Sequence, residues 1–298
     1  MNATDTFQQH RPRLSALAYR LLGSRSDAED LVQDAWLRWH QADRADIRDP
    51  EAWLVTATTR LGIDRLRAAR SQRETYIGPW LPEPERIDDA PGPAQLTERT
   101  QQVSLAFLAV LERLGPEERA AWLLREAFDY DYAQIAALLE QSEANCRQMV
   151  HRAKQRLEAG RPRFEVRPDK HRSLLERFMQ AARDGDRQAI GALLHADARL
   201  TSDGGGKAIA VRRPLFGAER IGRLFWAVWR RHDPLLEWRM GMVNGEPAIL
   251  RYREGVLLGV MVAVSDGERI LELLTVANPD KLGAAATAVT DPVAAPSW

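Results

Sequence analysis

Residues 131–157 read DYAQIAALLEQSEANCRQMVHRAKQRL, and this stretch decides how the first half of the chain folds. Asp131, with Gln134 three positions later, is a capping-box pattern that predicts a helix beginning at Tyr132. Ser142 can cap a second helix after a short turn. Apolar residues recur at helical spacing on both segments, so the two helices can pack on each other. These positions are Ile135, Leu138, Leu139, Cys146, Met149, Val150 and Ala153. The stretch therefore predicts a helix-turn-helix.

The second predicted helix turns guanidinium, amide and imidazole groups outward. Such a set suits the edges of bases in a major groove and the flanking phosphates. The residues predicted to read DNA are Arg147, Gln148, His151, Arg152, Lys154 and Gln155. A solvated helical hairpin with a charged face is the alternative interpretation of the same pattern. Cys146 on the inner side is expected to be a small buried hydrophobe rather than a redox sensor.

The composition is ordinary for a globular protein. The 298 residues are 45% hydrophobic and 28% charged, which predicts two or three domains. No run approaches the roughly 18 apolar residues of a membrane span, and the N-terminal MNATDTFQQHRPR lacks a signal-peptide core. The single cysteine excludes an internal disulfide and an all-cysteine metal site. We expect a soluble cytoplasmic protein with no cofactor and no metal.

The formal net charge of +0 conceals segregated charges. Arginines and lysines crowd residues 60–73 and 147–156, whereas acids gather in residues 27–34 and 83–89. DNA responds to a local basic face rather than to the total charge of a chain. Neutrality therefore does not exclude DNA binding, but it predicts weak affinity for DNA on its own.

The first 75 residues predict helices only. One helix runs from about Phe7 to Leu22 and ends at Gly23. Ser26 with Glu29 is a capping-box pattern for a second helix that ends near residue 40. Asp49-Pro50 is a suitable N-cap and first residue for a third helix, to about residue 70.

The second of these helices contains SDAEDLVQDAWLRW, residues 26–39, with a concentrated acidic outer face. Phosphates would repel that face, so it suits a basic protein partner rather than DNA. A solvated charged face is the alternative interpretation.

Residues 76–100 contain five prolines among acids and glycines, which predicts an extended linker. Helices are expected again at about 101–114 and 116–127, before the helix-turn-helix. Gly160-Arg161-Pro162 ends this helical half.

The remainder predicts a small α+β domain. Helical patterns cover about 173–183, 187–194 and 218–231. Four strands, at about 235–243, 248–253, 256–264 and 269–277, are divided by Asn244-Gly245, Glu254-Gly255 and Asp266-Gly267. Such turns predict an antiparallel meander. The tail after Leu282 is expected to be disordered.

The acidic DAEDLVQDAW helix, the segment WLVTATTRLGIDRLR, the linker and the helix-turn-helix resemble extracytoplasmic-function (ECF) RNA polymerase sigma factors over about residues 7–160. The resemblance implies a sigma-2 helical bundle at residues 5–75 that binds the clamp helices of the largest polymerase subunit and opens the −10 element. It implies a sigma-4 domain at residues 101–160 that binds the −35 element and the flap of the second-largest subunit.

The resemblance also assigns residues to these contacts. The residues implied for the polymerase contact are Asp30, Gln33, Asp34 and Trp36. Those implied for the −10 strand are Arg60, Asp64, Arg65, Arg67 and Arg70, with the loop at 42–49 nearby. Single-stranded DNA needs aromatic stacking as well as positive charge. Aromatic residues are scarce here, so the residue that captures the flipped −10 base stays open.

Three further signatures resemble the subgroup of the SigJ type, which carries a C-terminal SnoaL-like extension. They are YIGPWLPEP at 76–84, DGGGK at 203–207 and NPDKL at 278–282. The resemblance implies that the extension regulates the sigma domains in place of a separate anti-sigma factor. The regulatory residues implied are Trp80, Pro82, Asp203, Gly204, Gly205, Gly206, Lys207, Asn278, Pro279, Asp280 and Lys281.

The predicted fold class is therefore multidomain: two all-α sigma domains followed by an α+β NTF2-like (SnoaL-like) cone. The boundaries expected are 5–75, a linker at 76–100, 101–160, 170–282 and a tail at 283–298. The three glycines at 204–206 could cradle a phosphate, but no helix is predicted after them. We expect this loop to pack on the linker or the sigma domains instead.

An enzymatic role for the extension is the main alternative. His195, Asp197 and Asp203 could act as acid–base groups, with Trp226, Trp229 and Trp238 as pocket walls. We expect instead that His195 and Asp197 lie at a helix-to-strand turn, where such residues commonly act as caps. The tryptophans, at helical spacing, are expected to be core residues. In addition, the sequence shows no oriented catalytic pair. The rivals to a non-enzymatic sigma factor are a DNA-binding factor that acts without polymerase, and an isomerase, cyclase or ligand sensor fused to such a module.

Overall fold

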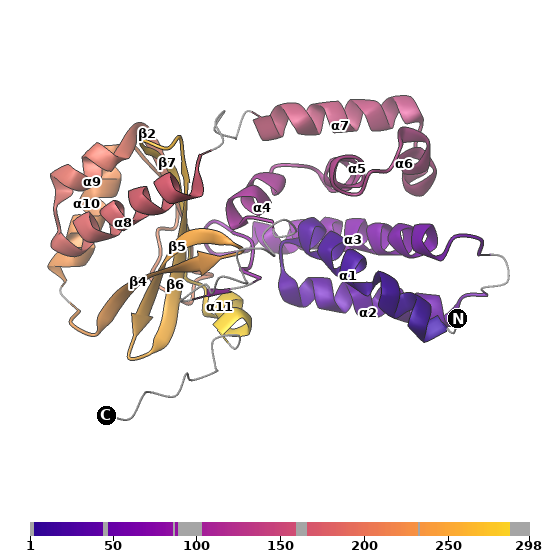
Figure 1. Ribbon diagram of the computed structural model, residues 1–298, viewed down its shortest axis with the longest axis horizontal. Coiled ribbons are helices and arrows are strands. Elements are labelled where there is room, and N and C mark those ends of the chain that lie inside the picture. The colour runs from indigo at the N-terminus through magenta and orange to yellow at the C-terminus, as the bar shows by residue number, and fades with distance from the viewer. Residues whose placement is uncertain are drawn as a thin grey trace. The chain divides into compact units, whose positions relative to one another are not determined.

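The computed structural model describes residues 3–43, 47–85, 87–88, 103–158, 166–231 and 233–286. Contacts divide the chain into two compact units (Figure 1). The helical unit comprises residues 1–75 and 108–161, and the sheet unit comprises residues 76–107 and 162–298. The linker from Tyr76 onward thus groups with the C-terminal fold rather than with the helices that precede it.

The helical unit begins with three helices packed on one another. They are α1 (Ala3–Leu22), α2 (Arg25–Gln41) and α3 (Pro50–Glu74). Gly23 ends α1 in the left-handed region at φ 67°, as predicted. Asp49 caps α3 by accepting from the Ala52 amide at 3.0 Å. The predicted cap of α2 is wrong: Ser24 accepts from the Asp27 amide at 3.2 Å, and Ser26 lies inside the helix.

Four more helices follow. They are α4 (Leu105–Leu111), α5 (Pro116–Ala127), α6 (Tyr132–Leu139) and α7 (Glu143–Glu158). The capping box at Asp131 and Gln134 is present, with reciprocal bonds of 2.7 and 2.9 Å. Ser142 caps α7 through the Asn145 amide. Cys146 is fully buried, and burial raises the pKa of its thiol. The helix-turn-helix and the burial of the cysteine are confirmed.

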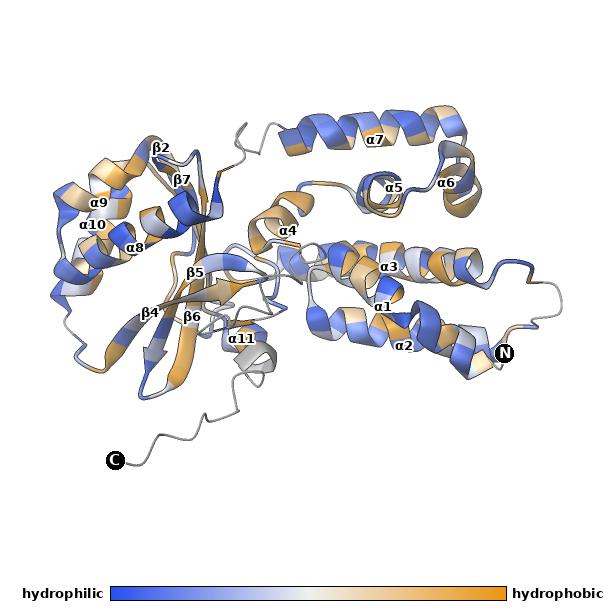
Figure 2. Ribbon diagram, viewed as in Figure 1, coloured by the Kyte–Doolittle hydropathy of each residue, from blue (hydrophilic) through white to orange (hydrophobic). Residues whose placement is uncertain are grey.

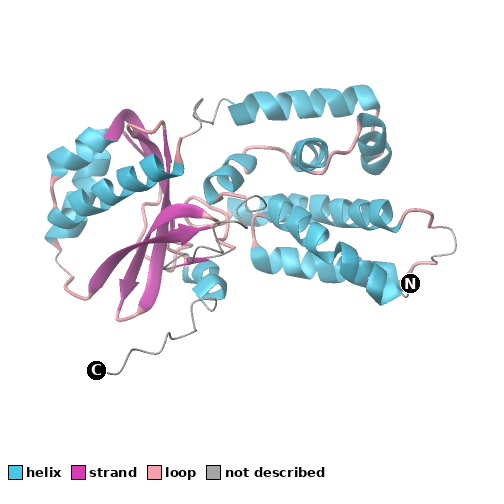
Figure 3. Cartoon of the chain, viewed as in Figure 1, coloured by secondary structure: helices cyan, strands magenta, loops and turns pink. Residues whose placement is uncertain are grey.

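Among the described residues of the sheet unit, seven strands form one sheet in the order β1-β4-β5-β6-β7-β2-β3 (Figure 3). Its strands are β1 (Ile87–Asp88), β2 (Leu194–Asp203), β3 (Leu215–Phe216), β4 (Leu236–Val243), β5 (Glu246–Arg253), β6 (Val256–Ser265) and β7 (Ile270–Val276). Its helices are α8 (Pro168–Asp184), α9 (Arg187–Leu193), α10 (Ala218–Arg230) and α11 (Pro279–Ala286). The predicted meander of four antiparallel strands is β4 to β7.

The expectation of a purely antiparallel sheet is wrong. Strand β2 pairs in parallel with β7, so that Leu200 lies opposite Leu273. His195 and Asp197 lie inside β2 rather than at a turn. Residues 194–200, LHADARL, do alternate apolar and polar side chains as a strand does, but the parallel partner lies more than 70 positions away and leaves no local signal of the pairing. The predicted tail is also partly wrong, because α11 continues to Ala286; residues 287–298 lie outside the described residues.

Helices α8, α9 and α10 supply the core that packs on one face of this sheet (Figure 2). Phe178 and Phe225 meet edge to face, with ring centroids 5.0 Å apart. Trp238 packs against this core, as expected. Trp226 and Trp229 do not: they are 38% and 45% exposed, so the expectation that they are core residues is wrong.

No helix in the described parts of the chain combines the length and apolar character needed to cross a bilayer.

Candidate nucleic-acid interface and linker docking site

Helix α7 presents most of the predicted DNA-reading residues on its exposed side. Five buried residues fix the helix on its neighbours: Cys146, Met149, Val150, Ala153 and Leu157. The predicted residues are all exposed: Arg147, Gln148, His151, Arg152, Lys154 and Gln155. The imidazole of His151 and the amide of Gln155 lie 3.0 Å apart. The geometry provides a polar, rigidly supported helical face of the kind that enters a major groove.

Arg147 is held in place before any DNA is bound. Its guanidinium donates to Glu143 at 2.7 Å and lies over the Tyr132 ring, 5.2 Å from the centroid. Arg125 stacks on the same ring at 4.9 Å. The planar guanidinium therefore loses less conformational freedom on binding than a free side chain would.

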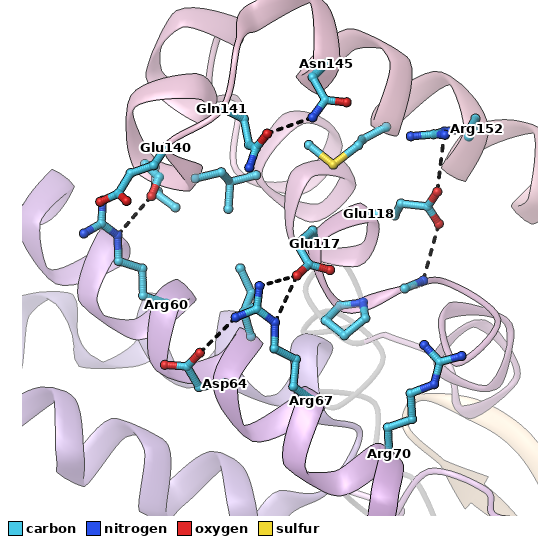
Figure 4. A pocket seen from close by; sticks show the side chains of 16 residues that line it. Arg60, Asp64, Arg67, Arg70, Glu117, Glu118, Glu140, Gln141, Asn145 and Arg152 are labelled. Atoms are coloured by element: carbon cyan, nitrogen blue, oxygen red, sulfur yellow. Dashed lines mark hydrogen bonds and ion pairs between the residues drawn. The ribbon is translucent and has the colours of Figure 1, made fainter.

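Arg152 faces a different direction from Arg147. Its Nε lies 3.6 Å from Glu118, which also binds Arg156 at 2.5 Å. Glu118 belongs to α5, so Arg152 turns toward that helix (Figure 4). The predicted set thus divides into an outward group, in which Arg147 pairs with Glu143 on its own helix, and Arg152, which pairs with α5.

The predicted −10 arginines Arg60, Arg67 and Arg70 line a cleft of about 740 Å³ between α3 and helices α5, α6 and α7 (Figure 4). Arg60 donates to the Leu138 carbonyl at 3.0 Å and pairs with Glu140 at 2.9 Å. Arg67 pairs with Glu117 and with Asp64, and the bond to Glu117 raises the pKa of Arg67. Glu117 and Glu140, from α5 and the end of α6, thus pair with arginines that the sequence predicted to bind DNA.

Arg65 belongs to another surface. It binds Asp34 at 2.5 Å and the Asp27 carbonyl at 2.8 Å. The structure thereby joins one residue of the predicted −10 set to one of the predicted polymerase set. Of the other polymerase residues, Asp30 and Gln33 are exposed, whereas Trp36 packs on Phe7 with ring centroids 5.0 Å apart.

Sequence reasoning missed Arg119, which is 1% exposed. Its Nε donates to the Arg20 carbonyl at 3.0 Å and its Nη1 to Glu112 at 2.5 Å. Glu112 also binds Arg73. Burial lowers the pKa of Arg119, and Glu112 opposes that effect. Glu112 lies in the turn just before α5, but the carbonyl of Arg20 is 99 positions away, so no local signal shows that this arginine is buried.

In the sheet unit, the three signatures of the predicted regulatory set meet at Asp203, which is fully buried. Its Oδ1 accepts from the Tyr76 hydroxyl at 2.5 Å and the Gly205 amide at 3.1 Å. Its Oδ2 accepts from the Leu81 amide at 2.8 Å and the Lys281 ammonium at 2.6 Å. One carboxylate therefore binds the linker, the glycine loop and α11 together.

Lys281 completes the docking of the linker. It donates to the Leu81 carbonyl at 2.5 Å and lies 3.9 Å from the Trp80 ring centroid, a close cation–π contact. Asn278 donates to the Tyr76 oxygen at 2.9 Å. Burial, with Asp203 beside it, raises the pKa of Tyr76 far above its ordinary value, so the phenol remains a neutral donor. Pro82 lies buried beside these residues in the chain.

The glycine loop approaches the linker too closely for side chains. Gly206 has φ +73°, and a Cβ there would lie 2.8 Å from Ile77. Gly205 has φ +59°, and a Cβ there would lie 2.3 Å from Asn278. The loop packs on the linker, as predicted, and Lys207 pairs with Asp280 at the surface at 2.5 Å.

The turn between β4 and β5 binds the chain at Glu85, within the linker, and at Val103, just after it. Asn244 accepts from the Glu85 amide at 2.9 Å and donates to the Val103 carbonyl at 3.1 Å. Glu246 accepts a hydrogen bond from Ser104, and burial raises the pKa of this carboxyl to about 7. Residues 89–102, between the two docked ends, lie outside the described residues.

We predict that Asp203→Asn releases the linker, because Lys281 is left buried without its counter-ion. Losing one partner of a buried pair typically costs about 3–5 kcal/mol. Chemical denaturation and limited proteolysis within residues 76–85 measure the effect. The matched control is Asp280→Asn, which breaks the exposed pair with Lys207 and should cost less than about 1 kcal/mol. Equal behaviour of the two variants would contradict this assignment.

We predict that the sheet unit loses stability as pH rises from about 4.5 to 7, because the protonated form of Glu246 is favoured by folding. The raised folded-state pKa means that the full contribution is present below the unfolded value of 4.5. The shift corresponds to roughly 3 kcal/mol. Urea unfolding across this range should show the loss, and Glu246→Gln should flatten the profile. A Gln variant that keeps the wild-type slope would show that another group is responsible.

Comparison with known proteins agrees with this geometry. Residues 6–72 match the family model for Sigma-70 region 2, and residues 104–157 match that for Sigma-70 region 4. The chain is 38% identical over 287 residues to the ECF RNA polymerase sigma factor SigJ of Mycobacterium tuberculosis, covering 92% of this chain and 91% of that protein.

It is also 31% identical over 278 residues to the probable ECF RNA polymerase sigma factor SigI of the same species, covering 93% of each. The crystal structure of M. tuberculosis SigJ superposes with a TM-score of 0.70 at 31% identity, covering 95% of this chain and 99% of SigJ. The chain therefore belongs to the ECF RNA polymerase sigma factors and is a homologue of SigJ.

Proposed function

We propose that this chain carries core RNA polymerase to promoters, reads the −35 and −10 elements, and is modulated in cis by its sheet unit. The observation that carries the proposal is the outward face of α7, a polar helix on a fixed helix-turn-helix scaffold. Arg147, Gln148, His151 and Gln155 supply base-reading groups there, and Lys154 supplies a phosphate contact. The family membership supports the same function.

The −10 element is assigned to α3. Arg60, Arg67 and Arg70 would contact phosphates of the melted strand, with Asp64 and Arg65 beside them. The two promoter elements are named for positions 25 base pairs apart, which is about 85 Å of duplex at 3.4 Å per pair. In this structure the cleft that Arg60, Arg67 and Arg70 line is bordered on its other side by α5, α6 and α7, and of the −35 residues Arg152 lines it. The pairs Arg60–Glu140 and Arg67–Glu117 must therefore separate before both elements can be read.

The polymerase contact is assigned to the acidic face of α2. Asp30 and Gln33 are exposed and ready for a basic partner. Asp34 and Trp36 have roles inside the unit, so they would support that face as much as touch the partner. We assign this face to the clamp helices of the largest subunit, and the sigma-4 domain to the flap of the second-largest subunit. Action on polymerase places the protein in the cytoplasm.

Regulation in cis is assigned to the docked linker. Only Thr75 separates the end of α3 from Tyr76, whose hydroxyl binds Asp203. Docking both ends of the linker on the sheet unit shortens the tether between the two sigma domains. The residues through which we propose that it acts are Trp80, Pro82, Asp203, Gly204, Gly205, Gly206, Lys207, Asn278, Pro279, Asp280 and Lys281.

We infer that the sheet unit is not an enzyme. Asp203 is fully engaged by the linker, the Gly205 amide and Lys281, and the ring nitrogen of His195 accepts from the backbone amide of Asp197 at 3.2 Å. Trp226 and Trp229 are exposed rather than lining a cavity. None of the candidate acid–base groups has an oriented partner for proton transfer.

We predict that Asp30→Lys abolishes co-purification with core polymerase while leaving the fold intact, because it reverses the charge of an exposed side chain. Pull-down with core polymerase and run-off transcription measure the effect. Asp197→Lys, an exposed carboxylate in the sheet unit, is the matched control and should bind normally. Specific operator binding and regulation without polymerase would instead support an independent DNA-binding factor.

We predict that Arg147→Ala weakens −35 recognition by about 1–3 kcal/mol if the guanidinium reads a base. Electrophoretic shifts with holoenzyme on wild-type and −35-substituted promoters test it. The loss should appear on the wild-type element and shrink on the substituted one. A variant that responds to every promoter as the wild type does would show that Arg147 is not a reader.

We predict that removing all residues after Pro168 changes run-off transcription by core polymerase, because the linker then loses its docking site. The full-length Asp203→Asn variant should shift output in the same direction. Unchanged output at every promoter tested would rule out regulation by the sheet unit.

A further inference from the structure

Helix α10 carries an unusual exposed surface on the outside of the sheet unit. We define the α10 surface as the side chains of Arg220, Arg223, Trp226, Trp229, Arg230 and Arg231, all of which are exposed. The apolar side of the same helix packs in the core, where Ile221 and Phe225 are buried. The two indoles lie outside that core cluster and leave 38% and 45% of their area exposed, which is high for large aromatic side chains.

The surface is positively charged. Its one acidic neighbour on the helix, Glu219, is shared by Arg187 at 3.2 Å and Arg223 at 2.5 Å. Within the described part of the chain, no carboxylate forms an ion pair with Arg220, Arg230 or Arg231. At least three guanidinium groups thus remain available to an anionic partner.

The aromatic groups are positioned rather than loose. Arg230 lies over the Trp226 ring, 4.9 Å from its centroid, so cation and ring share one stack. Trp229 rests on Gly185, at the end of α8, where a Cβ would come within 2.3 Å of the indole. Gly185 also has φ +67°, which disfavours any other residue there. Trp229 can therefore pack in this position only because residue 185 has no side chain.

We propose that the α10 surface binds single-stranded nucleic acid, with unpaired bases stacked on Trp226 and Trp229 and phosphates paired with Arg220, Arg230 and Arg231. Fixed aromatic rings interleaved with cations are the combination that single strands require. A duplex offers no free base faces to the indoles. A lipid surface would require a wide apolar helical face, and here that face is buried in the core. This proposal goes beyond promoter recognition and does not depend on it.

Fluorescence anisotropy of the full-length chain tests the proposal with labelled 20-mers of deoxythymidylate and uridylate, each against a duplex of equal length. The double variant Trp226→Leu/Trp229→Leu should bind the single strands less tightly, by roughly 5- to 150-fold for each base that loses its stacking partner. The uridylate arm decides whether DNA, RNA or both are bound.

The charge contribution is tested separately. Arg220→Gln/Arg230→Gln should reduce the slope of log affinity against log salt by about 1.4, or 0.7 for each phosphate that no longer pairs with an arginine. Phe216→Leu is the matched aromatic control: Phe216 is exposed and has Arg199 over its ring at 5.7 Å, but it lies outside the α10 surface. This control should bind as the wild type does.

Helix α3 is itself proposed to bind the melted −10 strand, so the binding site must be located directly. Oligonucleotides containing 5-iodouracil, crosslinked by light and mapped by mass spectrometry, should label Trp226 or Trp229 in the wild type and in Arg67→Gln alike. Crosslinks confined to the helical unit would overturn the proposal. So would unchanged single-strand affinity in the double tryptophan variant, or equal affinity for the duplex.

Discussion

The Asp203 carboxylate is fully buried, and the position of the linker depends on what binds it. Removing a carboxylate and an ammonium from water costs several kcal/mol each, and the cost is offset only where the geometry is close and the remaining lone pairs are bonded. Asp203 meets that condition with four donors, of which two come from the linker. The linker thus supplies groups without which the pair Asp203–Lys281 would be unfavourable. Docking is therefore cooperative: losing Tyr76 or Leu81 weakens the ion pair, and losing the ion pair frees the linker.

The charged contacts of the helical unit have a different character. Arg67 and Glu117 are 58% and 38% exposed at their side chains, and Arg60 and Glu140 are 45% and 76% exposed. Solvent screens such pairs, so they contribute little stability and exchange readily for other partners. A phosphate presents the same charge as a glutamate and can replace it at the same arginine. By contrast, Arg119 and Glu112 are nearly buried and resist exchange. The exchangeable pairs line the cleft assigned to DNA, whereas the buried pair holds helices in place.

Local sequence predicted most of the elements and few of their partners. Capping residues such as Asp131 and Asp49 act within one helical turn, so the limits of α3, α6 and α7 could be predicted. The parallel pairing of strand β2 could not, because its partner β7 is remote in the chain, although the alternating residues 194–200 carry a strand signal. Arg119 escaped notice for the same reason, since its burial depends on a carbonyl of α1. The signatures at 76–84, 203–207 and 278–282 were recognised by resemblance, but only the structure places Asp203 at their centre. Ser24 and Ser26 were equivalent by residue type, and backbone geometry decided between them.

These contacts show how a chain with a net charge of +0 can still carry arginines placed to bind DNA. Acids that could have been spread over the surface instead lie opposite arginines: Glu117 and Glu140 face α3, and Glu118 faces α7. In each such pair, the glutamate offsets the charge of the arginine in the electric field at a distance. The arginine nevertheless stays in position for a DNA phosphate that displaces the glutamate. Long-range attraction depends on the summed field, whereas affinity at contact depends on the groups exposed after rearrangement. A chain built in this way gains little from encountering DNA alone. We expect the affinity to rise once a partner separates the paired helices. The net charge stays the same, but the arginines are then free to bind phosphates, so neutrality is not evidence against DNA binding.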